Sequence, residues 1–123
     1  MQESLVHRLC QQSGSRPAAP ALRWRRSRWS YEQLVRCAAA VAELLRVHGA
    51  NAGDRVCLLF RNSPQYVAAY YGVLMAGCAA VPLKAQERAP VLERQLQHSG
   101  SRLLLCEGAH PELSALKQLL PKH

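Results

Sequence analysis

Histidine, cysteine and serine are the residue types of this chain that could carry out nucleophilic catalysis. The sequence holds five histidines and five cysteines among 123 residues. Catalysis of that kind needs a serine or cysteine, a histidine and an acid to converge in space. Any chain of this composition offers such combinations, so the residue types alone predict no catalytic group. His48 and His98 fall near the expected ends of helices, where a partial positive charge suits the helix dipole, and we interpret both as structural.

The cysteines lack the spacing of a metal site or a disulfide framework. Their number is odd, the gaps are long and no two form a C-x-x-C pair: Cys10, Cys37, Cys57, Cys78 and Cys106. We therefore predict no zinc site. Three of them sit in apolar runs, where a free thiol behaves as a small hydrophobe and fits a reducing compartment. Residues 1–14 lack the apolar segment of a secretory signal, so we expect a cytoplasmic protein.

Arginine supplies most of a formal net charge of +8. A basic balance can indicate nucleic acid, an anionic membrane or an acidic partner, but arginines spread through every segment favour an ordinary solvated surface. The strongest nucleic-acid feature is Arg23–Trp29, which reads RWRRSRW. Its arginines could pair with phosphates while its tryptophans stack on bases. We favour instead a solvated hairpin whose tryptophans turn inward, because alternating Arg and Trp is typical of a half-buried strand.

Phosphate-binding loops are absent from the sequence. Neither the P-loop pattern nor the dinucleotide-binding glycine pattern occurs. A helix N-terminus at Ser63 could bind an anion through its dipole, although most such termini bind only water. Three tyrosines could line a substrate pocket, but aromatic residues at helical spacing more often pack in a core, and we favour packing: Tyr66, Tyr70 and Tyr71.

Hydrophobic patterning predicts alternating strands and helices after residue 55. Short apolar runs predict buried strands at 56–60, 79–83 and 103–106, and helical spacing predicts helices at 64–77, 90–100 and 110–120. Such alternation implies parallel strands joined by right-handed helical crossovers. The predicted fold class is therefore α/β, a β-α-β-α-β-α unit. Its open sheet edges would need another segment or a partner chain to cover them.

A helix and a hairpin precede this unit. The sequence predicts a helix at 4–12, a breaker-rich link at 13–20 and a small hairpin at 21–31. Ser30 then caps a helix that ends at Gly49, with Gln33 at the capping-box position. Its apolar stripe comprises Leu34, Cys37, Ala38, Val41 and Leu45. We divide the chain into an N-terminal helix and linker, residues 1–20, and a partial α/β domain, residues 21–123.

Residues 62–83 carry no charge over a length that could span a bilayer. Prolines and glycines interrupt the run at Pro64, Gly72, Gly77 and Pro82. Its apolar part is rich in alanine and glycine. We therefore interpret it as a buried helix, a turn and a buried strand.

Five short segments of the chain resemble those of one known family. They begin at residues 29, 53, 61, 76 and 98 and read WSYEQL, GDRV, RNSPQY, AGCAAVPL and HSGSRL. In the same order they resemble the (T/S)Y-x-x-L helix entry and the GDRV, NSPEY, KAGAVVVPL and DSGARVLI segments of the adenylate-forming enzymes, the superfamily of acyl-CoA synthetases and related ligases. The order and spacing make the resemblance specific, although each piece alone is weak.

The resemblance implies a carboxylic acid ligase whose chemistry lies elsewhere. Members of the family bind ATP and a carboxylic acid, form an acyl-adenylate with release of pyrophosphate, and pass the acyl group to CoA or a carrier-protein thiol. ATP, Mg²⁺ and CoA are thus implied for the full-length family. The family's phosphate loop, aromatic-Gly-x-Thr-Glu motif, ribose-binding aspartate and late catalytic lysine have no counterpart in this sequence. We therefore assign no catalytic, cofactor-binding or metal-binding residue, and expect no cofactor bound and no adenylation by this chain alone.

Departures from the family pattern leave the acid substrate unassigned. Lys84 and Ala85 follow Leu83 where the family usually has Asn or Asp and then Pro, and Met75 replaces a lysine. We interpret the chain as a truncated N-terminal portion of a ligase: a piece of a full enzyme, a gene remnant, or one half of a split enzyme whose partner chain carries the ATP site. The alternative is a non-catalytic binding module that uses Arg23–Trp29 to bind an anion or nucleic acid.

Overall fold

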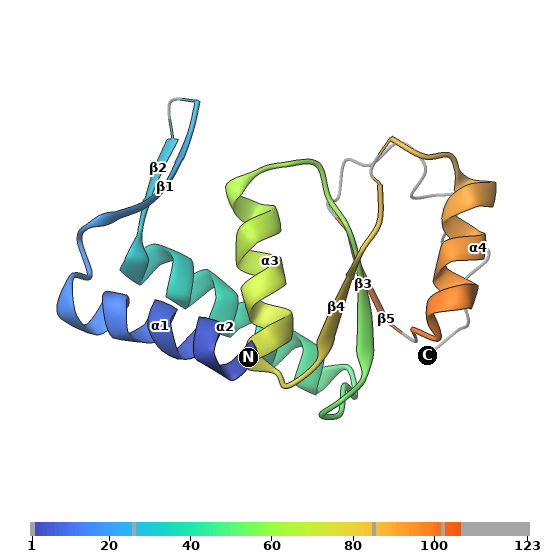
Figure 1. Ribbon diagram of the computed structural model, residues 1–123, viewed down its shortest axis with the longest axis horizontal. Helices are drawn as coiled ribbons and strands as arrows, with labels where there is room; N and C mark the ends of the chain where they lie inside the picture. Colours follow the sequence, from blue (N-terminus) through green and yellow to red (C-terminus); the bar gives the residue numbers. More distant parts are fainter. Residues whose placement is uncertain (1, 26, 85, 102, 107–123) are drawn as a thin grey trace.

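The computed structural model describes residues 2–25, 27–84, 86–101 and 103–106 (Figure 1). Its helices are α1 (Gln2–Ser15), α2 (Tyr31–Val47), α3 (Pro64–Met75) and α4 (Ala89–Ser99). Its strands are β1 (Pro20–Trp24), β2 (Ser27–Ser30), β3 (Arg55–Leu59), β4 (Ala79–Pro82) and β5 (Leu103–Cys106). The predicted order of elements is confirmed up to residue 106. The helix predicted at 110–120 lies outside the described residues.

The sheet that follows α2 is parallel, as the alternation of strands and helices predicts. Its strand order is β4-β3-β5, and Val56 of β3 lies beside Ala80 and Leu103. Figure 1 shows α3 on one side of this sheet and α4 on the other. The fold is therefore an α/β arrangement with helices on both faces, and β3 is the central strand, buried between the two layers.

Alternate side chains of β3 enter two separate clusters. Val56 and Leu58 pack with Val73 of α3 and Leu45 of α2. Cys57 and Leu59 pack instead with three residues of α4: Ala89, Leu92 and Leu96. These four side chains of β3 are fully buried, whereas Arg55 at its start is exposed. A continuous apolar run is what a central parallel strand requires, because successive side chains point to opposite faces and both faces are covered.

The N-terminus of α2 closes with a capping box. Ser30 Oγ accepts a hydrogen bond from the Gln33 N–H at 3.1 Å, and Gln33 Oε1 accepts one from the Ser30 N–H at 2.8 Å. Two amides that the helix itself cannot satisfy thereby gain partners. The buried face of α2 consists of Leu34, Ala38, Ala42 and Leu45, and the predicted Cys37 and Val41 flank it half-buried.

Helices α2 and α3 cross at close range. A Cβ added to Gly72 of α3 would lie 2.5 Å from Val41 Cβ and 2.8 Å from the Ala38 carbonyl oxygen. The absence of a side chain at Gly72 therefore permits the approach of the two helices.

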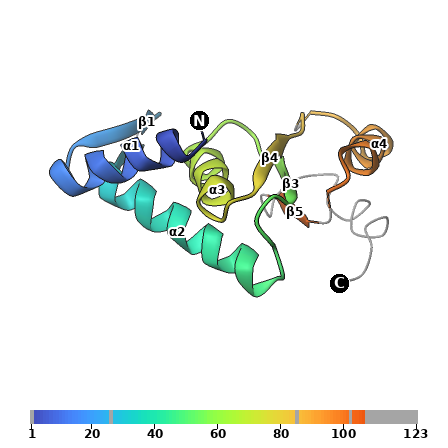
Figure 2. The same cartoon turned by 60° about the horizontal axis from the view of Figure 1, so that its bottom comes forward.

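The N-terminal helix is longer than predicted. It continues through Ser13 and Gly14 to Ser15, where the sequence predicts a link. Ser15 Oγ donates to the Gln11 carbonyl at 2.9 Å and the Arg16 N–H donates to the Gln12 carbonyl at 2.8 Å, so local hydrogen bonds close the last turn. Figure 2 shows α1 lying along α2, and packing there outweighs the weak helix propensity of Gly14.

Residues 62–83 fold into α3 and β4, as predicted, rather than into one continuous helix. Among the described residues, no helix has the length and apolar character needed to cross a membrane.

Candidate functional site

Three of the motif segments meet at the amino end of the parallel sheet. The Gly53 N–H donates to the Gly77 carbonyl at 2.9 Å, which joins the turn before β3 to the turn before β4. Arg55 Nη1 donates to the Ser99 carbonyl at 2.7 Å, which joins β3 to the end of α4. A cation close to the last carbonyls of a helix also suits its dipole. These residues hold the ends of the elements together and have a structural role.

A small polar network lies under this end of the sheet. The Cys57 thiol donates to Ser101 Oγ at 3.1 Å, and Ser99 Oγ donates to the Leu96 carbonyl at 2.7 Å. Cys57 has no exposed surface. A thiol without access to solvent cannot attack a substrate, so we assign Cys57 a structural role.

Two cationic side chains, Arg61 and Lys84, lie at the opposite, carboxyl end of the sheet. β3 leads to α3 on one face and its neighbour β4 leads to α4 on the other (Figure 1). Open α/β sheets bind ligands in the crevice outside such a pair of strands. A cavity of about 220 Å³ lies there, lined by Phe60, Arg61, Asn62, Tyr66, Leu83, Lys84 and Gln86.

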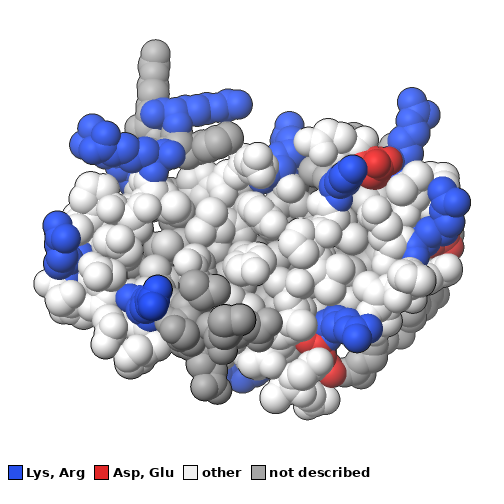
Figure 3. All heavy atoms as spheres, in the orientation of Figure 1, with Lys and Arg blue, Asp and Glu red and all other residues white. Residues whose placement is uncertain are grey.

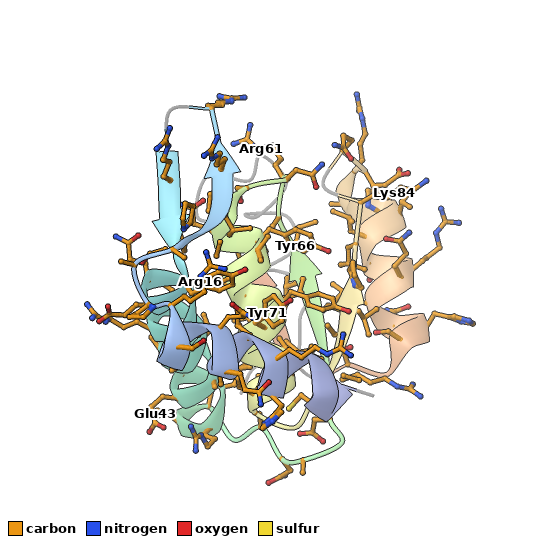
Figure 4. All side chains as sticks on the ribbon, turned by 60° about the vertical axis from the view of Figure 1, so that its left-hand side comes forward. Arg16, Glu43, Arg61, Tyr66, Tyr71 and Lys84 are labelled. Carbon is orange, nitrogen blue, oxygen red and sulfur yellow. The ribbon has the colours of Figure 1, made fainter. Side chains whose placement is uncertain are left out.

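Two connections contribute one cation each to this cavity. Arg61 follows β3 and Lys84 follows β4, and Figure 4 shows Arg61 and Tyr66 at the start of α3 with Lys84 toward α4. In the sequence, Arg61 is the first residue of the RNSPQY segment, and Lys84 is a departure from the family pattern. The missed signal was a cationic residue just after each of two neighbouring buried strands, a pattern that brings the side chains to one edge of a parallel sheet.

Ser63 caps α3, and its hydroxyl both donates and accepts a hydrogen bond within the chain. Ser63 Oγ accepts from the Tyr66 N–H at 3.2 Å and donates to the Arg61 carbonyl at 3.1 Å. The Val67 N–H donates to the Ser63 carbonyl at 3.3 Å, and Pro64 has no N–H to offer. These internal bonds weaken the hypothesis of an anion bound at the N-terminus of α3.

An aromatic row runs from the cavity along α3. Ring centroids lie 6.2 Å apart for Phe60 and Tyr66, 6.5 Å for Tyr66 and Tyr70, and 6.3 Å for Tyr70 and Tyr71. Burial raises the pKa of Tyr66, and the neighbouring Tyr70 raises it further. All three tyrosines pack half-buried against core clusters, in line with the packing interpretation.

The hairpin β1–β2 borders a second groove. The two strands pair antiparallel, with Leu22 opposite Trp29 and Arg23 opposite Arg28. Leu22 and Trp29 pack against the cluster of Leu9, Leu34 and Ala68, so Trp29 turns inward as the hairpin interpretation predicts. A groove of about 340 Å³ separates β1 from the start of α3, lined by Leu22, Arg23, Asn62, Ser63, Pro64, Tyr66 and Val67.

Among the described residues, the remaining candidates do not converge on a site. The five cysteines form no disulfide with one another, and Cys57 and Cys78 are buried. Burial raises the pKa of the Cys78 thiol, and the nearby Asp54 carboxylate adds to the increase. His48 lies at the C-terminal cap of α2 and His98 in the last turn of α4. Within the part of the chain that the structure describes, no group of three or more His, Cys, Asp or Glu side chains could hold a metal ion.

The chain has a parallel sheet with helices on both faces and a cationic cavity at its carboxyl edge. These features define an open α/β domain, a class of fold that binds ligands at that edge. A family model described as AMP-binding enzyme matches residues 9–123. Phenyloxazoline synthase MbtB of Mycolicibacterium paratuberculosis is 38% identical over 107 residues, which cover 86% of this chain and 9% of MbtB.

Solved structures show the same relationship. A fatty acyl-adenylate ligase from Legionella pneumophila, in complex with acyl adenylate and pyrophosphate, aligns with a TM-score of 0.78 at 33% identity. The alignment covers 86% of this chain and 20% of the ligase chain. The N-terminal domain of FACL13 from Mycobacterium tuberculosis aligns with a TM-score of 0.79 at 28% identity, covering 91% of this chain and 29% of that one.

The chain belongs to the family of AMP-binding enzymes, the adenylate-forming ligases. It corresponds to their N-terminal portion and spans less than a third of the length of each of these three proteins. The resemblance drawn from the five sequence segments is confirmed. The expectation that this portion carries no catalytic, cofactor-binding or metal-binding residue stays a prediction.

Proposed function

We propose that this chain is the N-terminal α/β portion of an AMP-dependent acid–thiol ligase. Such a ligase activates a carboxylic acid as its acyl-adenylate and then transfers the acyl group to CoA or a carrier-protein thiol. The family match over residues 9–123 carries the proposal. The Legionella relative, solved with an acyl adenylate and pyrophosphate, supports the first half-reaction. A cytoplasmic location and the division at residue 20 are parts of the same proposal.

The chain's own contribution is structural. The contact of Arg55 with Ser99 and the two-sided burial of β3 make it a scaffold for one end of a larger domain. ATP, Mg²⁺ and the thiol acceptor would bind to the rest of the ligase, because the ATP-handling motifs and the late lysine are absent from these 123 residues.

The rest of the ligase, in cis or as a separate chain, is the proposed partner. In the described part of the chain, β4 and β5 are the outer strands of the parallel sheet and have one strand neighbour each. Near the C-terminal end of α2, Leu44 and Val47 expose 49% and 71% of their surfaces. A cavity of about 230 Å³ separates α2 from β5, lined by Leu44, Leu45, His48 and Leu103–Leu105. Further strands or helices of the ligase would cover this edge.

ATP–pyrophosphate exchange tests the proposal directly. The purified 123-residue chain is incubated with ATP, Mg²⁺, labelled pyrophosphate and a panel of fatty, aromatic and amino acids. We expect no exchange above buffer, with a complete ligase of the family as the positive control. Exchange by this chain alone would refute the assignment of the chemistry to other parts of the enzyme. Co-purification of a second chain that restores exchange would identify the split form.

A further inference from the structure

We propose that the β1–β2 hairpin and the groove beside it bind an acidic polypeptide segment that carries an apolar side chain. This interaction goes beyond the ligase scaffold role. Figure 3 shows basic side chains gathered on the hairpin, which projects from the body of the molecule in Figure 1. The described arginines of the hairpin, Arg23, Arg25 and Arg28, are all exposed.

Like charges face each other across the hairpin. Arg23 and Arg28 are direct partners in the β1–β2 register, so their side chains leave the same face of the ribbon. Two like charges in this position repel one another and destabilise the pair of strands. Residues 16–31 contain no Asp or Glu that could offset the repulsion locally. Negative charge from a bound partner would relieve it.

The turn of the hairpin contains an arginine at a position that glycine or asparagine would favour. Arg25 has φ +56°, in the left-handed region that glycine and asparagine occupy more easily. Short hairpin turns of this kind usually carry Asn-Gly or Asp-Gly. An arginine at this position adds positive charge but adopts a backbone conformation that is unfavourable for its side chain. Residues held in unfavourable conformations of this kind often have a function.

The adjoining groove determines which acidic partner fits. Its walls combine Arg23 with apolar groups of Leu22 and Val67, in a space of about 340 Å³. An apolar side chain can enter such a space while neighbouring carboxylates pair with the hairpin arginines. A nucleic acid is a poorer fit, because Trp29 packs inward against the cluster of Leu9 and Leu34 and cannot stack on a base.

Fluorescence anisotropy of the 123-residue chain tests this surface. The probe is a fluorescein-labelled peptide of glutamates with one central leucine. We expect salt-sensitive binding that weakens about tenfold or more in the triple variant Arg23→Gln, Arg25→Gln, Arg28→Gln. The matched control is Arg8→Gln, Arg88→Gln, Arg94→Gln, which removes the same charge from exposed positions on α1 and at α4. Binding by this control should stay within about twofold of the unsubstituted chain.

Two comparison probes separate the alternatives. Replacing the central leucine by glutamine should weaken binding, and an unchanged affinity would overturn the role of the groove. Tighter binding of a single-stranded oligonucleotide of equal charge would overturn the peptide assignment in favour of nucleic acid. If the two triple variants lose the same affinity for the peptide, binding depends only on net charge, and the proposed site is refuted.

Resonance mapping gives a result that does not depend on the variants. On addition of the leucine-containing peptide to the unsubstituted chain, amide resonances of residues 22–29, 63 and 65–67 should shift together. Shifts confined to other elements would overturn the proposed location.

Discussion

Gly72 is the residue on which the packing of α2 against α3 depends. In the sequence it interrupts an uncharged run and argues against a membrane span. The structure gives it a second role, since a Cβ at this position would lie 2.5 Å from Val41 Cβ and 2.8 Å from the Ala38 carbonyl. The Ala38 backbone and the β-branched side chain of Val41 cannot move aside for a new Cβ unless the two helices move apart.

Substitution Gly72→Ala should therefore lower the free energy of unfolding by about 1–3 kcal/mol, the usual cost of overpacking a core. Urea denaturation followed by circular dichroism measures the change. Gly14→Ala is the matched control, because a Cβ there meets nothing within 4 Å. The control should be neutral or stabilising by up to about 1 kcal/mol. Equal stability of the Gly72 variant and the native chain would contradict the tight crossing.

At the scale of single elements, α2 depends on the cap that the sequence predicts. Ser30→Ala removes the acceptor of the Gln33 N–H and should cost about 1 kcal/mol of stability. Ser30→Asp should recover most of it, because its carboxylate accepts the same N–H and suits the helix N-terminus. Thermal denaturation of the three proteins gives the comparison. If the aspartate variant is as unstable as the alanine variant, the hydrogen bond at Ser30 is not the cause.

The start and end of α1 were harder to predict than those of α2. Ser13 and Gly14 read as the beginning of a link, since both have modest helix propensity. The helix nevertheless continues to Ser15 while Leu9 packs against Leu34 and Ala68. Capping residues mark a helix locally, whereas the length of a weakly patterned helix depends on the surface it lies on.

At the scale of the whole molecule, β3 joins two helical layers into one core. Cys78 lies in the cluster on the α3 side and Cys57 in the cluster on the α4 side. Both thiols are buried, whereas Cys10 is exposed. If the two layers unfold together, Cys57 and Cys78 become accessible in the same transition.

Thiol labelling across a urea series, read by mass spectrometry of peptides, tests this cooperativity. Cys10 should react at once in native buffer. Cys57 and Cys78 should react only with the global transition and with coincident midpoints. The raised pKa of Cys78 further slows its reaction in the native state, because the thiolate is the reactive form. Labelling of Cys57 at lower urea than Cys78 would show that the α4 layer opens independently.

Most of the helices and strands, and the family, can be predicted from the sequence. Buried strands such as Val56–Leu59, the capped helix after Ser30 and the five motif segments are local signals, readable because cap chemistry and hydrophobic period act over a few residues. The absence of the family's ATP motifs from this chain is likewise plain from the sequence.

Which distant residues come into contact depends on the tertiary structure. Arg55 reaches Ser99 across 44 positions, Arg61 and Lys84 come to one cavity, and Arg23 joins a groove with the start of α3. A local pattern marks Arg61 and Lys84 only as residues that follow buried strands. Whether these contacts form depends on the strand order β4-β3-β5 and on which face each helix covers. That choice depends on how all the apolar faces are buried at once, which is a property of the whole chain.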